Sequence, residues 1–168
     1  MKKQPKTSSL NRRTFIRGAA VTSAVAGFPA ITHSKSPNGK LAVGLIGVGG
    51  RGRGHVAGCR SEQVLSLCDV NQKALDGATR FPWCKDARTY VDFRDFYEKI
   101  DDIDAVVVST TEHTHAFATL PALQAKKHVY CEKPLTRDVH ECRIITEAAA
   151  KAGVQTQMGT QIHAGNNF

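Results

Sequence analysis

The stretch LAVGLIGVGGRGRGH, residues 41–55, decides the fold, because an apolar run passes directly into a loop with few side chains. Residues 40–47 predict a short buried strand. Gly47 then opens a G-x-G-x-x-G spacing, and a helix is predicted to begin near Gly52. Such a loop either is simply flexible or brings its backbone close to a negatively charged group.

Strand and helix patterns alternate along the rest of the chain, as they do in parallel sheets. Strands are predicted over residues 64–70, 88–91, 104–110, 128–132 and 154–159. Helices are predicted over residues 71–81, 93–100, 115–126 and 138–152. With right-handed crossovers, this order predicts an α/β fold, a doubly wound parallel sheet with helices on both faces.

The last predicted helix has the clearest end signals. Asp138 and Glu141 have capping-box spacing, and Gly153 is placed to end the helix. Its core face is predicted to consist of Val139, Cys142, Ile145 and Ala149. In the preceding helix, Pro121 must lie in the first turn or kink the axis. Asn71 is a plausible cap for the helix over 71–81.

The positive charge of the chain is concentrated at its N-terminus. Residues 1–35 hold seven of the 23 Lys and Arg residues and no Asp or Glu, within a net charge of +8. The other 16 basic residues nearly balance the 15 acidic ones. This balance argues against a broad surface for nucleic acid.

The first 36 residues resemble a twin-arginine export signal followed by a linker. Arg12 and Arg13 precede a weakly apolar stretch, residues 18–30, which is too short and too rich in Ser, Thr and Gly to span a bilayer comfortably. We therefore expect export to the periplasm through the twin-arginine machinery. The alternative is a basic tail without a targeting role.

The five cysteines do not predict a metal centre or a disulfide framework. Their number is odd, no CxxC occurs, and no Cys/His spacing matches a zinc site. His113 and His115 could suggest a metal pair, but no third ligand is evident. We expect no metal, and a capping or substrate-contact role for these histidines.

The glycines of the opening stretch suit a pyrophosphate. Gly47 permits a tight turn, Gly49 a close approach of the backbone to the ligand, and Gly52 close packing of helix on strand, with Gly50 between them. The helix N-terminus adds amide donors and a positive dipole end. Arg51 could add positive charge, although a solvated arginine is an equally good interpretation.

Asp69 supplies the second part of a dinucleotide pattern. It ends the second predicted strand, 22 residues after Gly47, close to the usual offset of about 20. A carboxylate there can accept hydrogen bonds from adenosine ribose hydroxyls and repels a 2′-phosphate, so NAD is favoured over NADP. The alternative role for Asp69 is that of a turn or cap residue before Asn71.

Two further segments follow predicted strands at the same sheet edge. Ser109 and Thr110 end the strand over 104–110, and we expect their hydroxyl and backbone groups to line the nucleotide. Glu132 and Lys133 lie in CEKP, residues 131–134. Lys133 could place an ammonium group beside a reacting oxygen, and the alternative is a surface Lys-Glu pair.

Together, GLIGVGGRGRGH, Asp69, TTEHTHA and HVYCEKPLT resemble the nucleotide-binding half of the Gfo/Idh/MocA oxidoreductase family. The resemblance implies a Rossmann fold over residues 37–160 that binds NAD. It places Lys133 near the nicotinamide and the substrate oxygen as a catalytic residue, with Glu132 beside it. His115 matches a histidine often found in the family and is the second catalytic candidate. GRGRGH is also similar to a subgroup of NAD-dependent glycosidases.

The sequence also departs from the family pattern. Thr111 replaces a usual proline, and Lys127 replaces a common glycine, so that a left-handed helix end there would be mildly strained. We expect the substrate domain to be missing or truncated, with residues 161–168 as the start of a truncated C-terminal region.

Three functions follow from this resemblance. The first is the N-terminal part of an exported NAD-dependent oxidoreductase acting on a sugar or polyol. The alternatives are a non-catalytic module that binds a dinucleotide and part of an NAD-dependent glycoside hydrolase. Self-association is left open.

Overall fold

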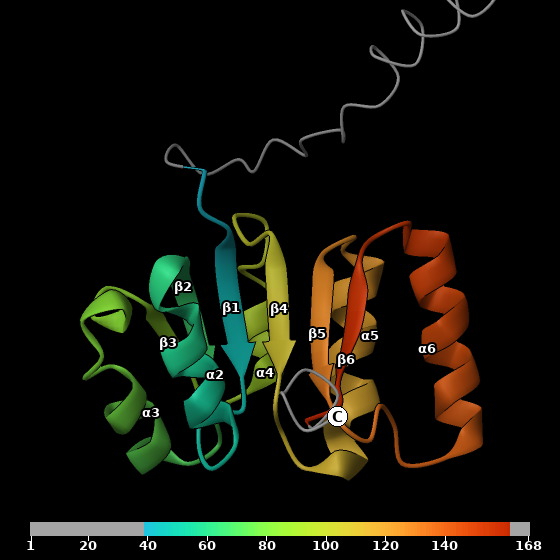
Figure 1. The fold of residues 1–168 in the computed structure, drawn as a ribbon, viewed down its shortest axis with the longest axis horizontal. Coiled ribbons are helices and arrows are strands. Elements are labelled where there is room, and N and C mark those ends of the chain that lie inside the picture. The colour runs from blue at the N-terminus through green and yellow to red at the C-terminus, as the bar shows by residue number, and fades with distance from the viewer. Residues whose placement is uncertain (1–38, 162–168) are drawn as a thin grey trace, which may run out of the picture. The chain divides into compact units, whose positions relative to one another are not determined.

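Six parallel strands form one sheet in the order β3-β2-β1-β4-β5-β6 (Figure 1). The computed structural model describes residues 39–161, so the predicted export signal lies outside the described residues. The strands are β1 (Ala42–Ile46), β2 (Gln63–Cys68), β3 (Arg88–Tyr90), β4 (Ala105–Val108), β5 (His128–Glu132) and β6 (Thr156–Gly159). The order reverses between β1 and β4, which confirms the doubly wound sheet and creates a switch point there.

Five helices connect the strands. They are α2 (Gly52–Gly58), α3 (Gln72–Ala78), α4 (Phe93–Tyr97), α5 (His115–Gln124) and α6 (Val139–Ala152). Three short 3₁₀ turns accompany them: η1 (Cys59–Ser61), η2 (Pro82–Cys84) and η3 (Glu112–Thr114). Within residues 39–161, no helix has the length and apolar character that crossing a membrane requires.

The sheet separates two hydrophobic cores. On one face, Leu45, Leu67 and Val56 pack with residues of α3 and η2. On the other face, Ile46 and Cys68 pack with Phe96 and with residues of α5 and α6. Neighbouring residues of β1 and of β2 therefore enter opposite cores, as the alternation of side chains along a strand requires. Both cores hold the carboxyl ends of β1, β2 and β4 in fixed positions.

Side-chain caps fix the starts of α3 and α6. Asn71 accepts a hydrogen bond from the Lys73 N–H, and Asp138 accepts one from the Glu141 N–H. Gly153 ends α6 with a φ of 65°. Pro121 lies inside α5, beyond the first turn. The prediction that Val139 belongs to the core was wrong: it is 68% exposed, because it is the first helical residue and burial in α6 begins only at Ile145.

The end of α5 corrects a second prediction. The left-handed residue is Lys126, with a φ of 56°, and not Lys127. The Lys126 N–H donates to the Leu123 carbonyl and the Lys127 N–H to the Ala122 carbonyl, each at 2.9 Å. These two bonds make a Schellman end, whose left-handed position is usually a glycine. A lysine therefore occupies a position that strains its backbone.

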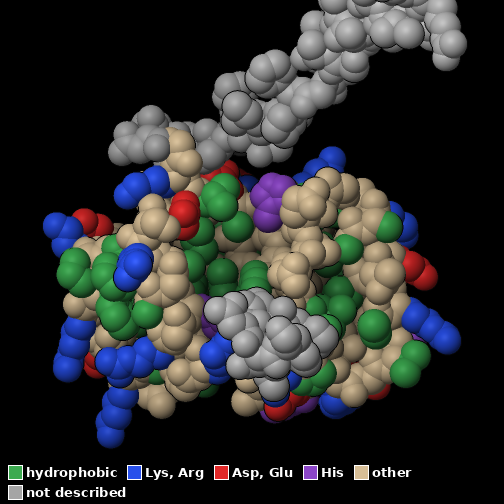
Figure 2. Space-filling model, in the orientation of Figure 1, with side chains coloured by type: hydrophobic (Ala, Val, Ile, Leu, Met, Phe, Trp, Pro, Cys, Tyr) green, Lys and Arg blue, Asp and Glu red, His purple; other side chains and the backbone are tan. Residues whose placement is uncertain are grey.

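Charged side chains are mixed on the face of the molecule shown in Figure 2. Lys and Arg residues lie mainly around the rim of this face, next to acidic residues. The apolar side chains visible between them belong to the sheet and its covering helices. The sheet edge where strands β1, β2, β4 and β5 end carries the candidate site.

Candidate functional site

A cavity of about 530 Å³ lies at the carboxyl ends of β1, β2 and β4. We call it the loop cavity, because the glycine loop between β1 and α2 forms one wall. Its other walls include Asp69 after β2, Asp92 before α4, and Ser109 and Thr110 after β4. This is the switch point of the sheet, where ligands bind in open α/β folds. The structure thus brings the predicted glycines, Asp69, Ser109 and Thr110 to one cavity.

Two glycines are required by close contacts of the backbone. Gly47 has a φ of 82°, and a Cβ there would lie 2.5 Å from the carbonyl oxygen of Ser109. A Cβ at Gly52 would lie 1.9 Å from the carbonyl oxygen of Gly47. Gly50 has a φ of 46° and open space around its missing Cβ. The loop therefore turns tightly, packs α2 against the strand, and leaves its cavity side free of side chains.

The carboxylate of Asp69 reaches back into the glycine loop. Its Oδ2 accepts hydrogen bonds from the backbone N–H groups of Val48 at 2.9 Å and Gly49 at 3.0 Å. Its Oδ1 accepts one from the Asn71 N–H at 2.9 Å. Oδ1 thus retains acceptor capacity on the cavity side, since each carboxylate oxygen has two lone pairs. Asp69 both fixes the loop and can accept a hydrogen bond from a ligand.

The loop cavity passes a simple test for a bound dinucleotide. The buried Oγ of Ser109 has no hydrogen-bond partner among the described residues, although a buried hydroxyl normally has one. The backbone carbonyl of Ser109 lies beside Gly47, where a side chain would have no room, and the Cβ of Ser109 lies 3.3 Å from the position that a Cβ of Gly52 would take. A carboxylate, a free hydroxyl and a backbone without side chains are the groups that a ribose and a pyrophosphate need.

Lys133 lines a second, smaller hollow of about 230 Å³, which we call the lysine hollow. It shares Arg51, Ser109, Thr110 and Thr111 with the loop cavity, so the two are adjacent along the sheet edge. Glu112 and Gln161 complete much of its remaining wall. The Lys133 side chain is exposed, which leaves its ammonium group accessible to a ligand.

Glu132 is buried and tied to helix α2. Only 4% of it is exposed, and its Oε1 accepts hydrogen bonds from Arg51 Nε at 2.9 Å and His55 Nε2 at 2.8 Å. Burial raises the pKa of Glu132, but the hydrogen bonds from Arg51, His55 and the Lys133 N–H outweigh it and lower the pKa overall. Glu132 is therefore an ionised carboxylate that joins the end of β5 to α2.

His55 was missed as a site residue by the sequence analysis. It lies four residues after Arg51, so both side chains emerge from the same face of α2. The four-residue spacing indicates that Arg51 and His55 share a face of the helix. It could not identify Glu132, 77 positions after His55, as the partner of both side chains.

His115 does not present a free ring nitrogen to the lysine hollow. It is 1% exposed, with Nδ1 2.6 Å from the carbonyl oxygen of Pro134 and Nε2 3.0 Å from that of Thr110. Each carbonyl can only accept, so His115 donates through a ring nitrogen that carries a proton, and its two contacts join the loop after β4 to the segment after β5. This contact positions the two loops around Lys133.

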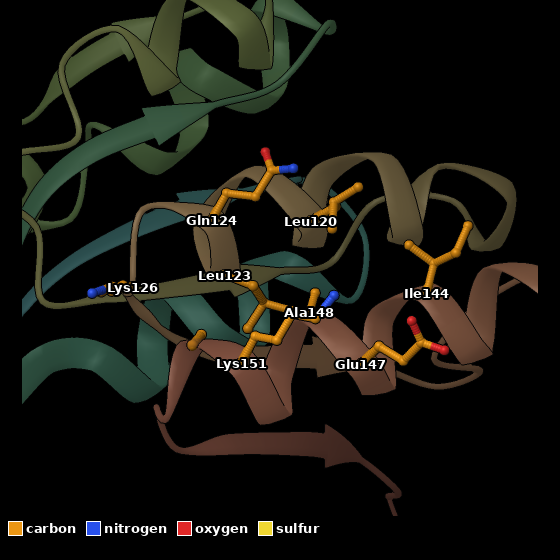
Figure 3. Close-up of a pocket in the computed structure, with 9 residues that line it drawn as sticks. Leu120, Leu123, Gln124, Lys126, Ile144, Glu147, Ala148 and Lys151 are labelled. Atoms are coloured by element: carbon orange, nitrogen blue, oxygen red, sulfur yellow. The ribbon is translucent and has the colours of Figure 1, made fainter.

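Another groove lies away from this edge, between α5 and α6 (Figure 3). Leu120, Leu123 and Ile144 line it together with Glu147 and Lys151. None of the predicted site residues contributes to it, so it is separate from the candidate site. No cluster of three or more metal-ligating side chains occurs within residues 39–161.

Comparison with known proteins identifies the fold family. The profile described as "Oxidoreductase family, NAD-binding Rossmann fold" matches residues 41–160. The chain belongs to the Gfo/Idh/MocA oxidoreductase family. The resemblance inferred from the sequence motifs is thereby confirmed, and the family supports a nicotinamide dinucleotide as the cofactor.

Two curated relatives are similar over different shares of the chain. The inositol 2-dehydrogenase of Klebsiella pneumoniae is 35% identical over 117 residues, covering 67% of this chain and 34% of the relative. The glycosyl hydrolase family 109 protein of Shewanella putrefaciens is 29% identical over 188 residues, covering 94% of this chain and 40% of the relative. The chain thus spans about a third of the first of these relatives.

Two solved structures share the fold of this chain over somewhat more than a third of their own length. The scyllo-inositol dehydrogenase of Lactobacillus casei with bound NAD(H) and scyllo-inositol is 25% identical, with a TM-score of 0.65 over 71% of this chain and 36% of that one. The WlbA dehydrogenase of Bordetella pertussis, in complex with NADH and UDP-GlcNAcA, is 25% identical, with a TM-score of 0.66 over 74% of this chain and 39% of that one.

Proposed function

We propose that this chain is the nucleotide-binding part of an NAD-dependent oxidoreductase that moves hydride between nicotinamide and a sugar or polyol hydroxyl. The adjacency of the two cavities carries the proposal, because four shared residues join the loop cavity to the lysine hollow. One extended ligand can therefore reach from Asp69 to Lys133. The relatives that act on inositol or bind a nucleotide sugar support the substrate class.

The residues of the chain have separate roles in this proposal. The glycine loop and Ser109 bind the phosphates and ribose, and Asp69 holds the adenosine end. Its negative charge favours NAD over NADP. Nicotinamide, when bound, supplies the hydride acceptor or donor. In alcohol oxidation, Lys133 as a neutral amine accepts the hydroxyl proton while hydride passes from the carbon to nicotinamide; in the reverse direction its ammonium group returns that proton. His115 holds the backbone on either side of that lysine.

Calorimetric titration of the chain with NAD and NADP tests the binding part of the proposal. We expect NAD to release heat on binding and to raise the melting temperature, with a smaller rise for NADP. The variant Gly47→Ala, whose Cβ would meet the Ser109 carbonyl, should lose binding, whereas Gly77→Ala, in open space on α3, should keep it. Absence of NAD binding by the unaltered chain would refute the proposal.

The role of Lys133 requires a full-length relative that carries the same Glu-Lys-Pro segment. Its lysine-to-alanine variant should lose turnover far more than NAD affinity, since the ammonium acts on the substrate and not on the adenosine end. Intact turnover would leave Lys133 a structural role.

A second candidate function is supported by one observation. The alignment with the family 109 glycosyl hydrolase covers 94% of this chain, more than the alignment with the inositol dehydrogenase does. A glycosidase of this kind would use NAD transiently, with hydrolysis as the net reaction. Steady accumulation of NADH absorbance during turnover of the full-length protein would separate a dehydrogenase from such a glycosidase. A third candidate is a module that binds a dinucleotide without catalysis.

We also propose export by the twin-arginine route, on the basis of Arg12, Arg13 and the apolar stretch after them. Residues 1–36 fused to a fluorescent reporter should direct it to the periplasm. Replacing both arginines with lysine should retain the reporter in the cytoplasm. A reporter that stays in the cytoplasm with the unaltered segment would argue against export.

A further inference from the structure

The carboxylate of Glu132 contacts two segments that the proposed function assigns to different groups. The glycine loop and α2 bind the phosphates of the dinucleotide, and Lys133 contacts the substrate oxygen. The Oε1 of Glu132 accepts from Arg51 and His55 on α2, and its Oε2 lies 3.3 Å from the N–H of Lys133. It thus connects the helix of the glycine loop to the lysine hollow. A buried carboxylate with this many donors is held in one orientation.

We propose that Glu132 is a positioning residue that orients Arg51 toward the pyrophosphate of the bound dinucleotide. The inference rests on the proposed function, because it requires a dinucleotide in the loop cavity. Glu132 acts through Arg51, and Arg51 makes the contact with the ligand. The Glu-Lys-Pro segment then has two tasks, one at each of its first two residues.

The geometry of Arg51 fits this task. Its Nε bonds Glu132, and a guanidinium group is planar and rigid, so this one bond fixes the plane of the whole group. The Arg51 side chain is still 53% exposed and borders both cavities. Its outer nitrogens can therefore face a ligand while Nε stays on Glu132.

The chemistry of the surrounding loop points to phosphate as the partner. Gly49 and Gly50 precede Arg51, and a Cβ at Gly50 would meet nothing within 4 Å. An anionic group can therefore approach the backbone beside Arg51. The pyrophosphate is the part of a dinucleotide with the negative charge that a guanidinium binds through paired hydrogen bonds.

His55 supports the same arrangement from one turn further along α2. Its Nε2 donates to the oxygen that Arg51 uses, and its side chain is only 16% exposed. With two donors on one oxygen, the Glu132 carboxylate cannot rotate without breaking both bonds. Arg51 is thus held by a carboxylate that is itself fixed.

Calorimetric titration with three ligands of increasing size tests the inference. Adenosine lacks phosphate, ADP adds the pyrophosphate, and NAD is the whole dinucleotide. The variants are Glu132→Gln and Arg51→Lys, which keeps the charge but loses the Nε bond. The matched control is Arg53→Lys, because Arg53 lies on the same helix with its guanidinium over the Phe81 ring, 5.9 Å from the ring centre.

We expect both test variants to lose about tenfold in affinity for ADP and NAD, as is typical for a hydrogen bond to a charged group. Their adenosine affinity should stay unchanged, and Arg53→Lys should bind all three ligands as the unaltered chain does. Thermal melting checks that each variant is folded. Should Glu132→Gln fail to fold, Arg51→Lys carries the test, because that side chain is half exposed.

Three results would overturn the inference. The first is unchanged affinity for ADP in a folded Glu132→Gln protein, and the second is unchanged affinity for ADP in Arg51→Lys. The third is an equal loss for adenosine and ADP, which marks a general disturbance of the cavity. Failure of the unaltered chain to bind NAD refutes the proposed function itself. The inference and the proposed function therefore fail by different measurements.

Discussion

Gly52 faces the carbonyl oxygen of Gly47 so closely that an added Cβ would lie 1.9 Å from it. Both atoms at this contact belong to backbone, so no flexible side chain can move aside. The first turn of α2 is thereby pressed against the end of β1. This contact sets the direction in which the helix leaves the sheet, and with it the position of the loop cavity.

The variant Gly52→Ala is expected to destabilise the fold by about 1–3 kcal/mol, the usual cost of overpacking. The control is Gly54→Ala on the same helix, where a Cβ would meet nothing within 4 Å. That change should stabilise the fold by about 0.5–1 kcal/mol, because alanine favours a helix over glycine. Urea unfolding measures both, and equal effects would contradict the close contact.

The variant Asp69→Asn should change both stability and cofactor preference. The Val48 and Gly49 N–H groups lose a charged acceptor, so we expect a loss of about 1–2 kcal/mol in the free energy of unfolding. Removal of the charge should also raise affinity for NADP relative to NAD. Asp86→Asn, at a surface position with an 88% exposed side chain, is the control. An unaltered NADP-to-NAD ratio would remove the discriminating role of Asp69.

The two catalytic candidates should differ in their effect on folding. His115→Leu removes the hydrogen bond that the buried imidazole donates and its contacts with the carbonyl oxygens of Thr110 and Pro134, so we expect a loss of about 1–3 kcal/mol. Lys133→Ala, at an exposed position, should change the free energy of unfolding by less than about 0.5 kcal/mol. Chemical denaturation compares them. A His115→Leu protein of normal stability would refute the role of this histidine as a tie between loops.

The lysine at the end of α5 gives a stabilising prediction. Lys126→Gly should raise the free energy of unfolding by up to about 1 kcal/mol, because glycine adopts a positive φ without strain. Lys127→Gly, next in the chain and without a positive φ, is expected to lose stability. The melting temperatures of the two variants should therefore shift in opposite directions. A lower melting temperature for Lys126→Gly would contradict the Schellman geometry.

Glu132 should contribute to the acid stability of the fold. Its pKa in the folded chain lies below the ordinary value of 4.5, so its stabilising effect is present above that pH and is lost as the pH falls through the lower folded value. We expect the stability difference between the unaltered chain and Glu132→Gln to shrink below pH 4.5. Asp92 and Asp138, whose pKa values are also lowered, occur in both proteins and cancel in the comparison. If the difference in the free energy of unfolding between the two proteins did not change with pH, the hydrogen bonds to Glu132 would not lower its pKa.

The sequence predicted the fold well where local signals were strong. All the predicted strands form: β1, β2, β4 and β5 contain short apolar runs, whereas β3 and β6 are mostly polar. The caps at Asn71 and Asp138 are as expected. The errors concern single positions. Val139 is apolar and at the correct helical spacing, yet its place at the helix start leaves it in solvent. The left-handed residue at the end of α5 is Lys126, one position before the predicted Lys127, because the exact end of a helix depends on its final hydrogen bonds.

The site was predictable in its members but not in their contacts. Motif spacing predicted that Gly47, Asp69, Ser109 and Lys133 lie at the same end of the sheet, since the carboxyl ends of parallel strands lie on the same side. The same spacing could not show that Glu132 bonds α2, or that both ring nitrogens of His115 contact backbone carbonyls. Those contacts join residues far apart in sequence, and only the folded chain brings them together.

The last strand of the sheet has a practical consequence for work with this chain. Among residues 39–161, strand β6 pairs only with β5, and its residues Thr156, Gln157 and Met158 are exposed. Amide and carbonyl groups along its other side can accept a strand from a neighbouring molecule, which is a common route to aggregation. Dilute samples and a light-scattering measurement before each titration would keep such edge-to-edge association from being mistaken for ligand binding.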